Sequence, residues 1–342
     1  MHNHEVIFED AAKICRRVNL AGVRDATVLV TGASGLLGTY FLATLCLLRE
    51  SGVSLKVHAQ VYSEPAPHTA EIIRRGGFNL LRANLADFQE CLALPEADVI
   101  LHAAGYGQPA AFLANPLATI QINTTATATL LQKLRPGGAF LFVSTSEIYS
   151  GLKKPLAQEA DIGSTTPLHP RASYIEGKRC GEAICNAARG RGVRATSGRL
   201  ALAYGPGTRK HDKRALNSFV ERALCQHRIE LLDAGKAVRT YGYVTDAVEL
   251  LWQAALHGTQ PVYNVGGRST VTIAELAELI GGLTGAPVVF PATQKEMAGA
   301  PEEVRLDLSR AESEFKKTDF VELKTGLRRV IDWQRGLYLQ PE

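Results

Sequence analysis

Val28-Leu-Val-Thr-Gly-Ala-Ser-Gly-Leu-Leu-Gly38 is the stretch that decides the fold. It begins in an apolar run, Ala26 to Val30, of the kind found in a strand buried on both faces. It leads into a largely apolar segment, Thr39 to Arg49, that favours a helix. Three glycines at the spacing G-x-x-G-x-x-G join the two: Gly32, Gly35 and Gly38. Glycine permits a tight strand-to-helix turn and lets backbone approach a pyrophosphate at the helix N-terminus, so the stretch predicts a dinucleotide site.

The composition excludes several other classes of protein. The 342 residues carry 38 Lys and Arg against 34 Asp and Glu, so we expect no nucleic-acid or membrane partner. No apolar run approaches the roughly 20 residues of a membrane helix, and the N-terminus lacks a secretory signal pattern. The six cysteines form no C-x-x-C pair and the nine histidines form no cluster. We therefore expect reduced thiols, no metal site and a cytoplasmic location.

Short strands and helices continue to alternate after the glycine turn. Further strands are expected in four segments: Leu55–Tyr62, Phe78–Leu81, Ala97–Gly105 and Ala139–Ser146. A long helix rich in Ala and Thr is expected over Pro116–Leu134. This alternation is typical of an α/β protein with a doubly wound parallel sheet.

Groups able to do chemistry follow the last of these strands. Ser144-Thr-Ser-Glu147 places hydroxyls and a carboxylate at a strand end, where open α/β sheets bind ligands. Tyr174 and Lys178, four residues apart, share one face of a helix expected to run to about Ala188. A phenol with a pKa near 10 is a poor base at neutral pH, but a neighbouring ammonium and an oxidised nicotinamide favour the phenolate. The alternative, a surface pair on an amphipathic helix, does not explain the glycine turn and the hydroxyls.

These motifs together resemble the extended short-chain dehydrogenases/reductases, the NAD-dependent epimerase/dehydratase family. The shared segments are Thr31–Gly38, Ser144–Glu147 and Tyr174-x-x-x-Lys178. Within the family, the sequence is most similar to UDP-glucuronate decarboxylases (UDP-xylose synthases). That similarity rests on four further segments: Asn115–Asn123, Arg171–Arg179, Tyr204–Pro206 and Val238–Val244.

The resemblance implies a Rossmann-type fold with a smaller C-terminal substrate-binding lobe. We expect an N-terminal helical extension over 1–24 and an NAD(P)-binding Rossmann domain over 25–203. Residues 204–342 would form mainly the substrate lobe, with some segments returning to the Rossmann domain. In that lobe, Thr272 and Glu275 predict a capping box at the start of a helix. The helices near 116–134 and 174–188 would form the four-helix interface of a homodimer.

The resemblance also implies catalytic roles. Tyr174 would take the proton of the sugar 4′-hydroxyl, Thr145 would bond the same hydroxyl, and Lys178 would lower the phenol pKa and bond the nicotinamide ribose. The 4-keto sugar so formed is a β-keto acid when C6′ is a carboxylate, so carbon dioxide leaves readily. Glu147 and Arg239 match residues around that reacting end, although Arg239 would equally suit a phosphate or ribose contact. NAD would be regenerated within each cycle, and the substrate would be a nucleotide sugar.

The remaining site residues are assigned by the same comparison. Cofactor binding is expected from Gly32, Ser34, Gly35, Leu36, Leu37, Gly38, Ser63, Asn84, Leu85, Ala103, Ala104, Gly105, Asn123, Ser144, Tyr174 and Lys178. Substrate binding is expected from Gln108, Thr145, Glu147, Arg171, Asn217, Ser218, Arg214 and Arg239. Ser63 stands near the position where an acid usually bonds the adenosine ribose, and Asn84 replaces a usual Asp, so NADP stays open beside NAD. Three basic residues after Pro206 would either contact phosphate or be solvated: Arg209, Lys210 and Arg214.

Three other functions remain open at this stage. In a 4,6-dehydratase, Glu147 would act as the base at C5′ and water would leave C6′. A 4-epimerase needs only Tyr174, Lys178 and a substrate able to turn over. A nucleotide-sensing module without turnover would not need the Tyr-Lys pair, which is present.

Overall fold

The computed structural model describes residues 4–291 and 305–339. Its main sheet has seven strands in the order β10-β6-β5-β4-β1-β2-β3, and all neighbouring pairs are parallel. In chain order these strands are β1 Thr27–Thr31, β2 Lys56–Val61, β3 Asn79–Arg82, β4 Ala97–His102, β5 Leu134–Thr145, β6 Arg194–Leu200 and β10 Val262–Val265. The predicted doubly wound parallel sheet is confirmed. Its strand order reverses between β1 and β4, where this class of sheet forms its ligand crevice.

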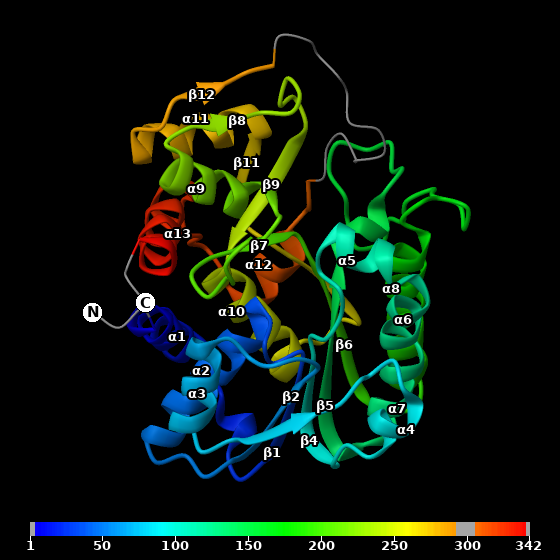
Figure 1. The fold of residues 1–342 in the computed structure, drawn as a ribbon. Helices are drawn as coiled ribbons and strands as arrows, with labels where there is room; N and C mark the ends of the chain where they lie inside the picture. Colours follow the sequence, from blue (N-terminus) through cyan, green and yellow to red (C-terminus); the bar gives the residue numbers. More distant parts are fainter. Residues whose placement is uncertain (1–3, 292–304, 340–342) are drawn as a thin grey trace.

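Helices cover both faces of the main sheet (Figure 1). On one face lie α2 Leu36–Glu50 and α10 Val244–His257, with α1 Glu5–Arg17 packed on both of these helices and α3 Pro67–Arg75 packed on α2. The other packs against α4 Phe88–Leu92, α6 Pro116–Asn123, α7 Thr125–Gln132 and α8 Ala172–Arg189. Successive residues of β1 alternate between the two cores, with Val28 and Val30 in one and Leu29 in the other. The sheet is thus buried on both sides, which explains its apolar strands.

The prediction of one continuous helix over Pro116–Leu134 is wrong, because this segment forms two helices. The chain breaks at Thr124, where ψ is −75°, so that α6 and α7 are separate helices. Threonine hydroxyls donate to carbonyls four residues earlier, Thr124 to Ile120 and Thr127 to Asn123, each at 2.8 Å. Such bonds compete with the backbone ladder and bend helices, which a count of apolar positions does not register. The strand β5 also begins at Leu134, earlier than the predicted Ala139.

A second lobe lies above the carboxyl edge of the main sheet in Figure 1. It contains the sheet β11-β9-β7 and the parallel pair β12-β8. Its elements are β7 Leu202–Tyr204, α9 Ala215–Gln226, β8 Ile229–Glu230, β9 Val238–Tyr243, β11 Ser269–Thr272, α11 Ile273–Thr284, β12 Val288–Val289 and α13 Leu323–Tyr338. The helix α12 Ser309–Phe315 packs instead on β10 and α10 at the main sheet. The capping box predicted at Thr272 and Glu275 is present at the start of α11. Within the predicted range 204–342, α10 and β10 lie with the main sheet, and residues 292–304 and 340–342 fall outside the described chain.

The N-terminal helix α1 connects the two lobes. Its Asp10 is fully buried and accepts a hydrogen bond from the Tyr243 hydroxyl at 2.6 Å. The Arg329 guanidinium of α13 pairs with the same carboxylate at 3.0 Å. The extension expected over 1–24, of which 1–3 lie outside the described chain, therefore contributes to the core between the lobes. None of the described helices has the length and apolar character needed to cross a membrane.

Candidate active site

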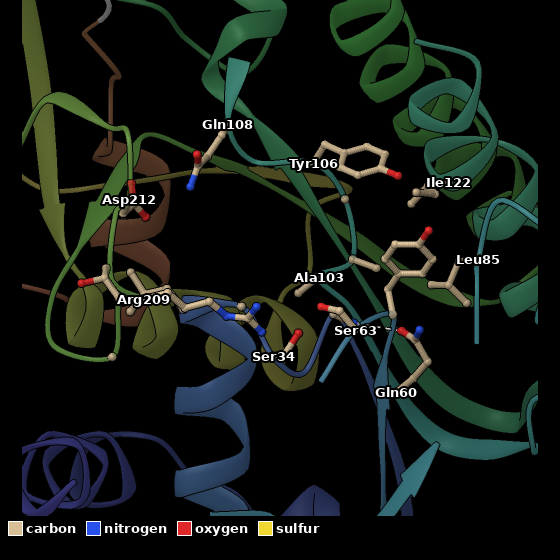
Figure 2. Close-up of a pocket in the computed structure, with 18 of the residues that line it drawn as sticks. Ser34, Gln60, Ser63, Leu85, Ala103, Tyr106, Gln108, Ile122, Arg209 and Asp212 are labelled. Carbon is tan, nitrogen blue, oxygen red and sulfur yellow. Dashed lines mark hydrogen bonds between the residues drawn. The ribbon is translucent and has the colours of Figure 1, made fainter. Parts of the chain in front are cut away.

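A cavity of about 410 Å³ opens at the carboxyl edge of the main sheet, beneath a loop of the second lobe (Figure 2). The segments that follow β1, β2, β3 and β4 form one wall, and residues 207–212 together with Arg214 form the other. Among the predicted site residues, the cavity is lined by Gly32, Ser34, Gly35, Leu36, Ser63, Asn84, Leu85, Ala103, Ala104, Gly105, Gln108 and Arg214. The cavity therefore spans the crevice where the strand order reverses.

The glycine turn has a shape that larger residues would destroy. Gly32 has a φ of +65°, and a Cβ there would lie 2.6 Å from the Ala104 Cα. A Cβ on Gly38 would lie 2.4 Å from the Gly32 carbonyl oxygen, so this glycine lets α2 pack closely on the turn. The N-cap of α2 is Gly35, which has no side chain to accept from the first backbone N–H groups. The turn therefore fits a pyrophosphate, whose oxygens would bond these donors.

Uncharged residues line the cavity beyond β2 and β3: Tyr62, Ser63, Asn84 and Leu85. The Gln60 side chain connects this end to the glycine turn, accepting from the Gly32 N–H at 3.1 Å and donating to the Ala83 carbonyl at 2.7 Å. The Asn84 side-chain oxygen accepts from the Ala86 N–H at 3.1 Å. Sequence reasoning missed Gln60 and Tyr62, because their approach to the cavity depends on how neighbouring strands pair.

Lys178 of α8 lies behind the cavity wall at Gly105. Its ammonium donates to the Val143 carbonyl at 2.6 Å and lies 4.6 Å from the centre of the Phe142 ring. A Cβ on Gly105 would be 3.9 Å from this nitrogen, so the amine lies next to the cavity lining at this glycine. Burial lowers the Lys178 pKa to about 7, and the Glu182 carboxylate opposes that shift.

Tyr174 stacks on an aromatic ring that the sequence did not single out. The rings of Tyr174 and Phe112, on α5 Pro109–Ala114, lie 4.6 Å apart and within 7° of parallel. Burial and the Glu147 carboxylate raise the phenol pKa to about 12, while a hydrogen bond with Thr145 and the charge of Arg171 lower it. Within the predicted triad, Tyr174 therefore contacts Thr145, and Lys178 is bonded two residues earlier on β5, at Val143. Phe112 adds a flat support for the phenol.

A carboxylate and two guanidinium groups lie beside the phenol. Glu147, on a short 3-10 helix over Ser146–Tyr149, accepts a hydrogen bond from Arg171 through Oε1. Its Oε2 is buried without a hydrogen-bond partner among the described residues. Burial raises the Glu147 pKa, and Arg171 and Arg239 act against that shift. An acceptor that lacks a partner in such a place is suited to a ligand.

Ser144, expected to face the cofactor, instead points into a buried network behind β5. Its hydroxyl donates to Glu182, and the same carboxylate pairs with the Arg199 guanidinium at 2.8 Å. Arg199 also donates to the Tyr149 hydroxyl at 2.7 Å. Because Glu182 lies one helical turn after Lys178, the network supports the helix that carries the Tyr-Lys pair.

The remaining predicted residues lie outside the cavity lining, as do Ser144, Thr145, Glu147, Arg171, Tyr174, Lys178 and Arg239. Asn123 is fully buried in α6, with an Oδ1 that has no partner among the described residues. Asn217 is buried in α9 and accepts from Gln334 at 3.2 Å. Leu37, Gly38 and Ser218 lie in α2 or α9 away from the lining, whereas Arg214 lines the cavity and is held by Asp212 at 2.9 Å. Within the described residues, no cluster of His, Cys, Asp and Glu has the geometry of a metal site.

Comparison with known proteins agrees with this geometry. The model of the NAD dependent epimerase/dehydratase family matches residues 28–266. UDP-glucuronic acid decarboxylase 1 of Arabidopsis thaliana is 27% identical over 327 residues, which cover 94% of this chain and 72% of that protein. UDP-glucuronic acid decarboxylase 6 of the same organism is 28% identical over 302 residues, covering 88% of this chain and 86% of that one.

Solved structures share the fold. UDP-glucose 4-epimerase of Thermotoga maritima superposes with a TM-score of 0.78 at 23% identity, covering 92% of this chain and 100% of that one. UDP-glucuronic acid 4-epimerase of Bacillus cereus superposes with a TM-score of 0.73 at 22% identity, covering 91% and 100%. The resemblance inferred from the glycine turn and the Tyr-Lys pair is confirmed. Because the family match covers more than half of its 342 residues, the chain belongs to the NAD dependent epimerase/dehydratase family.

Proposed function

We propose that the protein is an NAD-dependent enzyme that converts a nucleoside diphosphate sugar through a 4-keto intermediate, with UDP-glucuronate as substrate. The observation that supports this proposal is the contact of Tyr174 with Thr145 and Glu147 at the end of β5, with Lys178 bonded to the same strand at Val143 behind the Gly105 wall of a cavity floored by the glycine turn. The similarity to UDP-glucuronic acid decarboxylases supports the choice of substrate. Carbon dioxide would then be the first product to leave.

The cavity suits a nicotinamide dinucleotide. The glycine turn and the uncapped start of α2 would hold the pyrophosphate, and Lys178, close to Gly105, would reach the nicotinamide end. When bound, the nicotinamide supplies a hydride acceptor for C4′ of the sugar and, later in the cycle, a hydride donor. Burial raises the pKa of the Tyr174 phenol. The positive charge of a bound nicotinamide would lower this pKa and so favour the phenolate.

Each residue then has a defined task. The Tyr174 oxygen takes the proton of the 4′-hydroxyl as C4′ becomes a ketone, and Thr145 bonds the same hydroxyl. The ketone makes the C6′ carboxylate part of a β-keto acid, so the C5′–C6′ bond breaks and its electrons pass to the ketone as an enolate. Glu147, whose pKa burial raises, would be the group placed to return a proton to C5′. Arg239 and Arg171 carry guanidinium groups that suit the carboxylate or the diphosphate of the substrate.

A 4,6-dehydratase is the second candidate, because Glu147 is buried next to the phenol. A carboxylate there would abstract the C5′ proton while water leaves C6′. This route needs a hydroxyl at C6′, so the substrate would be a nucleotide-linked hexose. The two candidates share the first step and then differ: a decarboxylase breaks the C5′–C6′ bond, whereas a dehydratase loses the C5′ proton and the C6′ hydroxyl.

A substrate panel separates the candidates. The purified chain is incubated with NAD and either UDP-glucuronate, UDP-glucose or dTDP-glucose, and the products are identified by mass spectrometry and NMR. Release of carbon dioxide from UDP-glucuronate supports the proposal. A 4-keto-6-deoxy product identifies a dehydratase, and an inverted C4′ identifies an epimerase. Binding of NAD without turnover of any nucleotide sugar would overturn the proposal of an enzyme.

We also propose that α6 and α8 form a four-helix interface in a homodimer. These helices pack against each other, and their neighbourhood exposes Leu113, Leu117 and Ile120, with Leu117 75% exposed. Burial of this apolar surface by a second copy would stabilise the pair. Sedimentation of Leu117→Glu should then show a monomer where the unchanged protein is a dimer.

A reducing, cytoplasmic location is proposed as well, since all six cysteines are free thiols.

A further inference from the structure

The adenosine end of the cavity lacks the acid that usually selects NAD. In dinucleotide folds, a carboxylate after the second strand bonds the ribose 2′-hydroxyl, whereas an arginine nearby accommodates a 2′-phosphate. Here β2 ends at Val61, and Tyr62 and Ser63 follow as lining residues. The next acid, Glu64, directs its carboxylate to Arg82 at the end of β3. The nearest negative charge is therefore already paired.

An arginine from the second lobe stands in place of that acid. Arg209 lines the cavity, and its Nη2 donates to the backbone carbonyl of Glu64 at 3.2 Å, one residue beyond Ser63. Figure 2 shows its guanidinium reaching across the cavity toward Ser34 and Ser63. Among the described residues, this carbonyl is its hydrogen-bond partner and no carboxylate pairs with it. Its positive charge is thus available at the position of a 2′ substituent.

The loop that carries Arg209 is anchored rather than loose. The Thr208 carbonyl, one residue earlier, accepts from the indole N–H of the buried Trp333 at 3.1 Å. Asp212 is held by the Arg214 guanidinium, which neutralises the carboxylate among the lining residues of this loop. The charges of Asp212 and Arg214 cancel, so the charges of Arg209 and Lys210 make the part of the loop that lines the cavity positive.

We propose that this site accepts NADP as well as NAD, with the 2′-phosphate bound by Arg209 and the Ser63 hydroxyl. Arginine suits this task because its planar fork donates two parallel hydrogen bonds to a phosphate. The inference rests on the proposed function for the identity of the dinucleotide. It is also consistent with that function. Because the cycle returns the hydride to the sugar, it consumes neither NAD nor NADP, so the enzyme does not need to distinguish the two.

The test measures binding, independently of turnover. NAD⁺ and NADP⁺ are titrated into the full chain by calorimetry, with Arg209→Gln as the variant. A hydrogen-bonded charge pair corresponds to roughly a 10-fold or larger change in dissociation constant. Arg209→Gln should therefore weaken NADP⁺ binding about 10-fold and leave NAD⁺ binding within about 3-fold. The matched control is Lys213→Gln, which removes the same charge from an exposed position of the same loop outside the cavity lining.

A second variant tests the site by adding the missing charge. Ser63→Asp should weaken NADP⁺ binding by more than about 10-fold while NAD⁺ binding persists, because a carboxylate repels the phosphate and accepts from a ribose hydroxyl. The inference is overturned, with the proposed function intact, if the unchanged protein binds NAD⁺ and rejects NADP⁺. Equal weakening of both dinucleotides by Arg209→Gln would also overturn it, since that result indicates a pyrophosphate contact. Failure to bind either dinucleotide would reject the proposed function itself.

Discussion

The two ends of the cofactor crevice are built in opposite ways. At the proposed nicotinamide end, Lys178 and Arg199 are buried: Lys178 bonds to the Val143 carbonyl of β5, and Arg199 bonds to Tyr149 and to Glu182 of α8. At the adenosine end, Tyr62 is 67% exposed and Arg209 reaches in from another lobe. Proton and hydride transfer require atoms held to a fraction of an ångström, whereas anchoring a nucleoside requires only affinity. The end that performs the chemistry therefore matches the family motif, and the end that only binds departs from it.

The strongest test of this contrast is Tyr174→Phe. The substitution removes only the phenol oxygen, so the ring should still stack on Phe112 and cofactor affinity should remain. Loss of the general base is expected to reduce kcat by about 10²–10⁴-fold. Steady-state kinetics on the substrate found in the panel, together with NAD⁺ titration, would measure both. Turnover close to that of the unchanged protein would show that another group takes the 4′ proton.

The buried network behind the chemistry should be the next most sensitive. In Glu182→Ala, Arg199 and Ser144 lose a shared partner whose side chain is only 13% exposed. Removing one partner of a buried ion pair costs about 3–5 kcal/mol of the free energy of unfolding, because the other charge stays buried. Urea unfolding monitored by circular dichroism would measure the loss. A change below about 1 kcal/mol would mean that the network does not hold α8 in place.

The sequence predicted the parts of the site that depend on local spacing, and missed those that depend on tertiary contacts. The glycine turn and the i, i+4 Tyr-Lys pair carry their geometry within one turn or one helix, so they could be predicted. Ser144 has a side-chain direction set by Glu182, 38 residues further on. Phe112 reaches Tyr174 from a separate helix, α5.

The same distinction applies to the fold. The alternation of strands and helices predicted the parallel sheet, because periodicity reports burial directly. The break at Thr124 depends on threonine side-chain bonds, which leave no mark on that periodicity. For Arg209 the sequence leaves phosphate contact and solvation open, because its position near the end of β2 requires the second lobe to be docked.

For each pH unit, a smaller effect on the free energy of unfolding is expected from the titration of Lys178. Its pKa is about 7 in the folded protein against an ordinary value of 10.5, so between these values the unfolded chain binds more protons. Stability should therefore rise with pH through this window, by up to about 1.4 kcal/mol per pH unit, and be lost as pH falls toward 7. The variant Lys178→Met should lack this contribution. Comparing urea unfolding of the two proteins at several pH values between 7 and 10 isolates it, because other titrating groups are shared. Parallel curves would indicate that the lysine keeps its ordinary pKa.

The smallest effect on the free energy of unfolding should come from the exposed ion pair of Glu64 and Arg82, the counterpart of the buried pair of Glu182 and Arg199. Glu64 and Arg82 also form a carboxylate–guanidinium contact, but their side chains are 69% and 58% exposed. Water and salt screen such a pair, so Glu64→Gln should change the free energy of unfolding by less than about 1 kcal/mol. The backbone carbonyl that receives Arg209 is unchanged by this substitution, so the loop over the cavity keeps its contact. Measured beside Glu182→Gln, the same chemical change would then separate the two ends of the crevice by burial alone. Comparable losses in both variants would show that the adenosine end is as tightly held as the nicotinamide end, and that its departures from the family motif need another explanation.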